Sequence, residues 1–394
     1  MAGSPLSAPR LRVAIVAGES SGDTLGAALI EALRARVPDL EVFGVAGPKM
    51  RAAGCELLAD AHELSVMGLF EVLPHLPRLL RLRSRLAAQI AARAPDVFIG
   101  VDYQQFNLGL ARRLKRRGFA TVQYVSPQVW AWRQGRVRTI GRAFDLVLCL
   151  LPFEPDFYRE HAVAAEFVGH PLADQIPMAP DRAAARAALG LPAEATVVAL
   201  LAGSRLSEVQ RLAAPFLAAA SLLALRRPGL SVVAPMASPA TRRAFEQVTS
   251  ELPTPLPLRV LDGQARVALS AADAAFVASG TATLEAMLCR CPMVVAYRVG
   301  AMTALLLRAL RMVRLPYFAL PNWLAGEKLV PEFLQEAVLA EPMAGALEQL
   351  LDDRARREHL LQRFDGIHAL LKKNGAALAA EAVLQLLSAR TGRS

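Results

Sequence analysis

Residues 11–23 read Leu-Arg-Val-Ala-Ile-Val-Ala-Gly-Glu-Ser-Ser-Gly-Asp, and this stretch decides the predicted fold. Residues 11–17 form a short apolar run, which is typical of a buried strand. The glycine-rich turn that follows leads into an amphipathic segment at 24–36, which predicts a helix. A buried strand, a turn of small residues and a helix are the repeating unit of a parallel α/β sheet.

The same alternation continues along the chain. Further strands are expected at 42–45, 97–101, 120–124, 146–150, 197–201, 231–235, 274–277 and 293–296, with a turn-rich connection at 168–180. We therefore predict an α/β protein of two doubly wound Rossmann-like domains, residues 1–172 and 173–345, which face a cleft. Residues 346–394 are expected to be a helical tail that either packs back on the first domain or exchanges between subunits.

The composition narrows the choice of partner and compartment. The chain has 394 residues and a net charge of +10, which favours phosphates, nucleic acid or an acidic membrane surface. Its four cysteines, Cys55, Cys149, Cys289 and Cys291, have no metal-binding spacing, so we expect buried free thiols and no metal. No run of about 18 uninterrupted apolar residues is present, so we expect a cytoplasmic protein without a membrane span.

Three strand-to-helix turns are rich in small residues. They are 18–23, Gly203-Ser204-Arg205 and Ser279-Gly280-Thr281. Each offers backbone N–H groups at a helix N-terminus, where anions bind well. None is a Walker or dinucleotide-binding motif, and one such turn alone could be a simple helix cap. Three at equivalent positions favour a phosphate-bearing ligand.

Four charged or titratable side chains near these turns are candidates for chemistry. Glu285 could accept hydrogen bonds from ribose hydroxyls, or could simply complement a helix dipole. Arg205 suits the charge of a diphosphate leaving group, or could be a surface arginine. Asp102 ends an apolar strand, a position that fits a general base and a helix N-cap equally. His170 is a rival base, although its turn-rich surroundings fit a hinge as well.

Two basic amphipathic segments, 64–86 and 301–315, fit an anionic membrane surface, although each also fits a core helix with a solvated arginine face. The second carries Arg308, Arg311 and Arg314. The residues expected to face lipid are Val66, Met67, Leu69, Phe70, Leu73, Leu76, Arg78 and Arg81. The basic run at 112–117 leaves nucleic acid open by charge, but no nucleic-acid module accompanies it, so we expect none.

The motifs together resemble the lipid-A-disaccharide synthase family, which has the GT-B architecture. The match runs over nearly the full length, through residues 17–23, 124–133, 151–154, 168–171, 203–205, 278–285, 292–298, 320–325 and 330–335. The resemblance implies inverting transfer of the sugar of UDP-2,3-diacylglucosamine to the 6-hydroxyl of 2,3-diacylglucosamine 1-phosphate (lipid X). It also implies no cofactor, peripheral binding to the inner membrane, and a homodimer with exchanged tails.

The resemblance also implies roles for residues. Asp102 aligns with the family's essential aspartate and Arg205 with its essential arginine. The implied donor-site residues are Gly203, Ser204, Ser279, Gly280, Thr281, Glu285, Asn322, Glu332 and Gln335. The implied acceptor or cleft residues are Glu19, Ser20, Ser21, Gly22, Asp23 and Ser126.

Two segments depart from the family pattern. Tyr103-Gln104-Gln105 stands where the family has a proline and a second aspartate, and Ala202 replaces a proline.

The alternative functions to the synthase are a UDP-N-acetylglucosamine 2-epimerase of the same architecture and a non-catalytic UDP-lipid binding protein.

Overall fold

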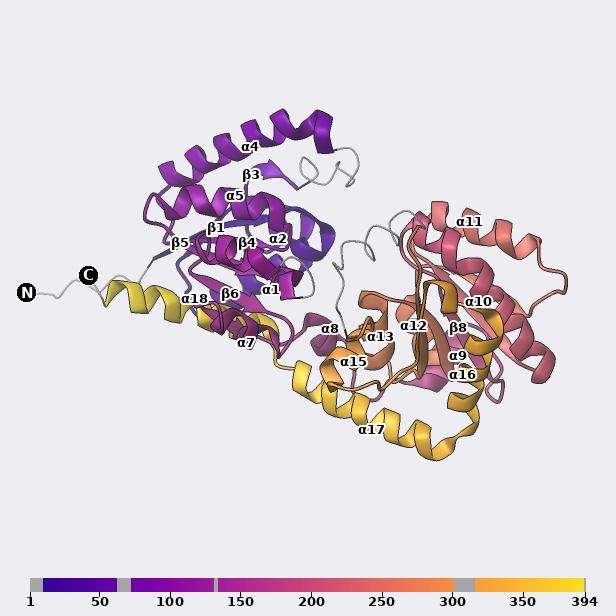
Figure 1. Ribbon diagram of the computed structural model, residues 1–394. Helices are drawn as coiled ribbons and strands as arrows, with labels where there is room; N and C mark the ends of the chain where they lie inside the picture. Colours follow the sequence, from indigo (N-terminus) through magenta and orange to yellow (C-terminus); the bar gives the residue numbers. More distant parts are fainter. Residues whose placement is uncertain (1–9, 62–71, 131–133, 301–315, 393–394) are drawn as a thin grey trace, which may run out of the picture. The chain divides into compact units, whose positions relative to one another are not determined.

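A computed structural model describes residues 10–61, 72–130, 134–300 and 316–392. The chain divides into two compact units (Figure 1). The first combines Met1–Asp174 with Leu371–Ser394, and the second is Gln175–Leu370.

The first unit is built on a parallel sheet with the strand order β3-β2-β1-β4-β5-β6-β7. Its strands are β1 (Leu11–Ala17), β2 (Leu40–Ala46), β3 (Glu56–Asp60), β4 (Val97–Val101), β5 (Ala120–Tyr124), β6 (Leu146–Cys149) and β7 (Ala165–Phe167). Its helices are α1 (Ser20–Arg34), α2 (Pro48–Ala52), α4 (Val72–Ala92), α5 (Gln104–Lys115), α6 (Val137–Gly141), α7 (Glu154–Arg159), α8 (Pro171–Gln175) and α18 (Gly375–Thr391), with 3-10 turns η1 (Gln128–Trp130) and η2 (Gln134–Arg136).

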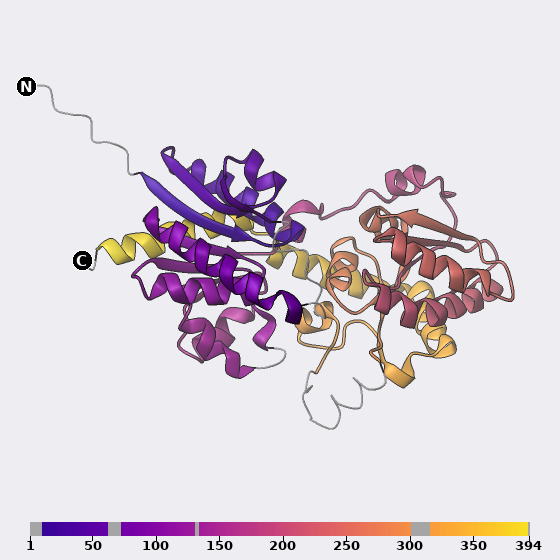
Figure 2. The same ribbon diagram turned by 90° about the horizontal axis from the view of Figure 1, so that it is seen from above.

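Apolar layers cover both faces of this sheet, as a parallel sheet requires. One layer includes Leu29 of α1 and Val383 of α18, and the other includes Leu86 of α4 and Leu110 of α5. The last helix of the chain, α18, therefore belongs to the core of the first unit, along which it runs in Figures 1 and 2. The Asp174 carboxylate holds its start by accepting the N–H groups of residues 374 and 375 at 2.9 and 2.7 Å.

The second unit is a parallel sheet with the order β10-β9-β8-β11-β12-β13. Its strands are β8 (Val197–Leu201), β9 (Ser231–Met236), β10 (Leu258–Asp262), β11 (Ala274–Ala278), β12 (Met293–Tyr297) and β13 (Glu332–Leu334). Its helices are α9 (Arg182–Ala188), α10 (Leu206–Arg226), α11 (Pro239–Ser250), α12 (Ala265–Ala271), α13 (Thr281–Leu288), α15 (Leu320–Ala325), α16 (Ala340–Asp352) and α17 (Arg354–Leu371), with the 3-10 turn η3 (Gln335–Ala337).

One helix of the described chain, α10, is long and apolar enough to cross a membrane by length and composition. One apolar face of this helix, which includes Phe216 and Leu217, is buried within the second unit. The helix is therefore accounted for as a core helix.

The two Rossmann-like sheets and the helical tail confirm the predicted fold class. The nine predicted strands are all present, and β1, β4, β5 and β8 have the predicted bounds. The sequence did not indicate β3, β7, β10 and β13, which pair at or towards the edges of the sheets and lack a continuous apolar run. Helix α1 begins at Ser20, so most of the predicted turn at 18–23 is the first turn of that helix.

Candidate functional site

In each unit, the candidate residues follow the two strands at which the strand order reverses. In the first unit β1 pairs with β4, and Ala17 lies opposite Val101. The turn after Ala17 and Asp102 are therefore neighbours. In the second unit β8 pairs with β11, so the turns after Leu201 and Ala278 are also neighbours. Such a switch point is where ligands bind in open α/β sheets.

Asp102 is held in a left-handed backbone conformation, with φ +50°. Its carbonyl accepts the side-chain amides of Asn107 at 2.9 Å and Gln123 at 3.0 Å, and its N–H donates to the Tyr124 carbonyl at 2.9 Å. A non-glycine residue in this conformation is uncommon and costs energy, so it persists only where the surroundings impose it. The clamp on the backbone leaves the partly buried Asp102 carboxylate to accept the Ser21 hydroxyl at 3.2 Å.

The residues that depart from the family pattern lie directly beside Asp102. Tyr103 also has a positive φ, +34°, and its ring fills the space above Gly18, where an added Cβ would lie 2.6 Å from the ring. Burial, and then the nearby Glu19, raise the pKa of Tyr103. The exposed Gln105 accepts a hydrogen bond from Arg136 at 3.2 Å. Gly18 therefore makes room for a side chain in this structure.

The predicted acceptor residues separate into two groups. Glu19, Ser20 and Ser21 are exposed at the start of α1. Asp23 is buried, and its carboxylate accepts the N–H groups of Gly47, Lys49 and Met50 at 2.9, 2.9 and 3.0 Å, which fixes the start of α2. This gives Asp23 a structural task. Gly22 and Ser126 are also buried.

The turn Ser279-Gly280-Thr281 has open space over its glycine. Gly280 has φ +150°, and an added Cβ there would meet no atom of the described residues within 4 Å. Gly280 and Thr281 are exposed, and the first residues of α13 carry N–H groups that the helix leaves without a partner. The Ser279 hydroxyl donates to the Phe318 carbonyl at 2.7 Å. A helix N-terminus with this geometry can bind an anion, and binding at this turn stays a prediction.

The turn Gly203-Ser204-Arg205 is different, because a carboxylate of the same unit already occupies it. Glu208 accepts the N–H groups of Ser204 and Arg205 at 3.0 and 3.3 Å, and its other oxygen lies 3.6 Å from the Arg205 guanidinium. An added Cβ on Gly203, at φ +124°, would lie 2.4 Å from the Glu208 Cβ. The glycine accommodates Glu208, and the Arg205 side chain is 81% exposed.

Glu285 lies one turn into α13 and is partly buried. Its carboxylate accepts a hydrogen bond from Arg266 at 3.3 Å, and Arg266 also donates to Gln175 at 3.1 Å. A ribose bound by Glu285 would therefore share that carboxylate with an arginine.

Asn322, Glu332 and Gln335 hold the segment that passes over the start of α13. Asn322 is fully buried and makes four hydrogen bonds of 2.8–3.0 Å, to residues 329, 330 and 332. The Glu332 carboxylate also accepts the N–H groups of Phe318 and Ala319 at 3.0 and 2.7 Å. Gln335 accepts the Val299 N–H at 3.3 Å. In this structure Asn322 and Glu332 hold the 317–332 segment from inside.

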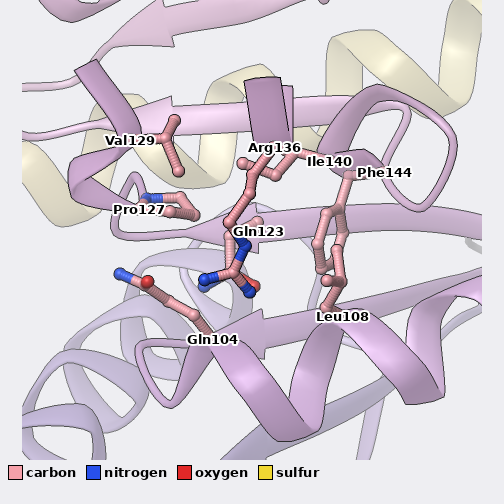
Figure 3. A pocket seen from close by; sticks show the side chains of 8 residues that line it. All are labelled: Gln104, Leu108, Gln123, Pro127, Val129, Arg136, Ile140 and Phe144. Atoms are coloured by element: carbon pink, nitrogen blue, oxygen red, sulfur yellow. The ribbon is translucent and has the colours of Figure 1, made fainter. Parts of the chain in front are cut away.

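A small pocket lies beside the Asp102 loop (Figure 3). Gln104 and Leu108 of α5, Gln123 of β5, and Pro127 and Val129 of the next loop line it, with Arg136, Ile140 and Phe144 completing the wall. Its cavity of about 20 Å³ has room for roughly one water molecule. Gln123 is fully buried, and its Oε1 has no hydrogen-bond partner in the described part of the chain.

Most of the residues predicted to face a membrane cannot be placed. Val66, Met67, Leu69 and Phe70 and the segment 301–315 lie outside the described residues, and Leu73 and Leu76 belong to α4. Arg78 and Arg81 are exposed on α4, beside Leu80, which is 41% exposed. His170, the rival base, accepts the Leu172 N–H at 3.2 Å, and burial lowers its pKa to about 4.

Comparison with known proteins decides the family. The family model for lipid-A-disaccharide synthetase matches residues 13–385. The lipid-A-disaccharide synthase of Pseudomonas aeruginosa is 53% identical over 380 residues, covering 96% of this chain and 99% of the relative. The chain belongs to the lipid-A-disaccharide synthase family. The synthase of Sodalis glossinidius is 52% identical over 383 residues, covering 97% of this chain and 100% of the relative.

Solved structures agree with this family's fold. The UDP-GlcNAc 2-epimerase of Neisseria meningitidis, bound to UDP-GlcNAc, matches with a TM-score of 0.64, at 12% identity, over 95% of this chain and all of that chain. A glycosyltransferase of kitacinnamycin matches with a TM-score of 0.63, at 18% identity, over 96% of this chain and 99% of that chain. At such identities these likenesses establish the fold alone.

Sequence reasoning missed three side chains that contact the candidate residues or the loops beside them. Gln123 clamps Asp102, Glu208 occupies the 203–205 turn, and Glu154 is buried behind the 125–130 loop. A glutamine inside the apolar strand 120–124 and a glutamate in the matched motif 151–154 were visible signals. Their partners come from distant segments, which the sequence does not pair.

The four cysteines are buried free thiols. The described residues contain no group of three or more potential metal ligands.

Proposed function

We propose that this chain transfers the sugar of UDP-2,3-diacylglucosamine to the 6-hydroxyl of lipid X, forming the β-1,6-linked lipid A disaccharide 1-phosphate and UDP. Membership of the synthase family over nearly the full length carries this assignment. The clamped Asp102 in the first unit and the open Ser279-Gly280-Thr281 turn in the second support it, since they supply a carboxylate and an anion site.

The proposed chemistry is direct inverting displacement. Asp102 removes the proton of the acceptor hydroxyl, and its clamped backbone keeps the carboxylate in one orientation. The hydroxyl oxygen attacks the anomeric carbon from the face opposite UDP, so the configuration inverts. The N–H groups at the start of α13 and the exposed Arg205 stabilise the departing diphosphate. Glu285 holds the ribose, and the 317–332 segment supports the donor site.

The occupied turn at 203–205 adds one step to this mechanism. Arg205 pairs with Glu208 before donor binds, and Glu208 holds the turn's N–H groups. Arg205 therefore exchanges a carboxylate for a diphosphate when the donor arrives. Its 81% exposure means that this exchange requires a rotation of the side chain and little desolvation.

The test is product analysis with purified protein. With UDP-2,3-diacylglucosamine and lipid X, we expect equimolar UDP and disaccharide 1-phosphate, and no UDP without lipid X. Interconversion of UDP-sugars without an acceptor would instead establish an epimerase. UDP binding without turnover of either kind would establish a binding protein.

We further propose a homodimer that binds the cytoplasmic face of the inner membrane through the α4 region. The support is the exposed Arg78, Leu80 and Arg81 on that helix. The protein should sediment with phosphatidylglycerol vesicles and not with phosphatidylcholine vesicles, and Arg78→Glu/Arg81→Glu should abolish the difference. Light scattering on the eluting protein measures the oligomeric state, and a monomer would contradict the dimer. Exchange of tails stays a prediction, because α18 packs here on its own chain.

A further inference from the structure

The buried carboxyl of Glu154 lies behind the loop of residues 125–130, which follows β5. Glu154 is 2% exposed. Its Oε1 accepts the indole N–H of Trp130 at 3.0 Å, and its Oε2 accepts the N–H of Leu151 at 3.0 Å. Trp130 also meets the ring of Phe153 edge-on, at 4.8 Å between centroids. The glutamate therefore ties the far end of the 125–130 loop to the turn between β6 and α7.

The near end of the same loop belongs to the same buried polar network. The Ser126 hydroxyl lies 3.1 Å from the Tyr158 hydroxyl, and both residues are buried. The Tyr158 hydroxyl also lies 3.4 Å from the Pro127 carbonyl. The loop is thus held at Ser126 and at Trp130 by one set of side chains from the β6–α7 region.

The 125–130 loop lies beside the loop that carries Asp102. Val125 has φ +76°, which is an outlier for a β-branched residue. Asp102, which follows the neighbouring strand, also has a positive φ. The amide of Gln123 donates both to the Val125 carbonyl, at 3.2 Å, and to the Asp102 carbonyl, at 3.0 Å. Pro127 and Val129 form one wall of the pocket in Figure 3, and Gln104, two residues after Asp102, forms another.

Burying a carboxyl group at this position is energetically unfavourable. Loss of water raises the pKa of Glu154 to about 7, although N–H and O–H donors offset part of that cost. The titratable groups that face it are Cys149 of β6 and Tyr158 of α7, and burial raises the pKa of both, so both stay neutral. A leucine would fill the space at lower cost, but it could not fix the direction of Trp130.

We propose that Glu154 is a positioning residue for the acceptor: through Trp130 it sets the far end of the 125–130 loop, and so the pocket wall beside Asp102, while Tyr158 holds the Ser126 end. This inference rests on the proposed function. Glu154 contacts neither substrate in this proposal; it acts through the loop. Because the loop belongs to the first unit, its displacement should affect the acceptor and leave the donor unaffected.

The test compares Glu154→Gln with Trp130→Phe, which removes the indole donor from the other side. Glu160→Gln, an exposed acid at the end of the same helix, is the matched control. We expect KM for lipid X to rise about tenfold in each variant, the effect of losing one buried hydrogen bond, with the donor KM and UDP affinity unchanged. Glutamine offers one carbonyl oxygen to the two N–H groups, of Trp130 and Leu151, that the carboxylate accepts. Both changes therefore weaken one network, and the double variant should raise KM by less than the product of the two single effects.

Two outcomes would overturn the inference. One is an acceptor KM within twofold of the native value in both variants. The other is an equal rise of donor and acceptor KM, which would indicate general loss of structure. If Glu154→Gln fails to fold, Trp130→Phe alone decides between these results. A native chain that releases no UDP with lipid X would refute the proposed function itself, a result distinct from either.

Discussion

Replacing Asn322 by alanine separates two roles for that residue, donor contact and loop support. The native amide is fully buried and makes four hydrogen bonds, to the N–H groups of residues 329 and 330, the carbonyl of residue 330 and the Glu332 carboxylate. Glu332 keeps two other donors, but Val330 is 1% exposed, so its N–H and carbonyl would be left without partners. The Leu329 N–H keeps the Glu327 carbonyl at 2.9 Å, so two unsatisfied groups at about 1–3 kcal/mol each suggest a loss of roughly 2–6 kcal/mol.

The assay is urea unfolding of the second unit. Of the three tryptophans, only Trp323 belongs to that unit, so a Trp130→Phe/Trp132→Phe background makes fluorescence report it alone. With an m-value of about 2.5 kcal/mol/M, Asn322→Ala should lower the midpoint by about 1–2 M. Lys328→Ala, an exposed change in the same segment, should move it by less than about 0.3 M.

UDP binding measured in the same samples decides the role. We expect UDP affinity to fall only as far as the segment loosens, and to recover partly in a stabilising osmolyte. An Asn322→Ala chain with native stability and no UDP binding would refute this reasoning and make Asn322 a direct ligand contact.

Three further predictions follow from the site. Asp102→Asn should lower kcat by about 10²–10⁴ with UDP affinity unchanged, measured by UDP release at saturating substrate; a full rate would exclude it as the base. Gly280→Ala should weaken UDP binding, because its Cβ enters the open space above the turn. Gly203→Ala should mainly lower the unfolding midpoint, because its Cβ meets Glu208. Calorimetry measures the UDP affinity of both variants, and equal losses would contradict this contrast. The pKa of Glu154 is raised from 4.5 to about 7 in the fold, so its stabilising contribution is complete below pH 4.5 and is lost as pH rises through 7. The stability of the native chain relative to Glu154→Gln should therefore decline by up to about 3 kcal/mol between pH 4.5 and 8, and a constant difference would refute the assigned pKa.

The sequence determined the layers of the fold and the positions of its turns. A continuous apolar run such as 97–101 is too short for a typical helix and fits a strand buried on both faces, so its location can be predicted without tertiary information. The sequence did not predict the short edge strands. β13, which includes Glu332, is defined by its pairing with β12 and by hydrogen bonds to a distant segment. Glycine spacing likewise located the turn at 279–281, which the structure leaves open.

Only the tertiary structure distinguished turns that look alike in sequence. Gly18, Gly203 and Gly280 each precede a helix, yet Tyr103 packs on the first, Glu208 fills the second, and no atom of the described chain lies within 4 Å of a Cβ placed on the third. The Tyr103 ring reaches Gly18 because β1 pairs with β4, a contact between segments far apart in the chain. The local sequence indicates which residues can form an anion site. Whether a side chain of the protein occupies that site depends on long-range packing.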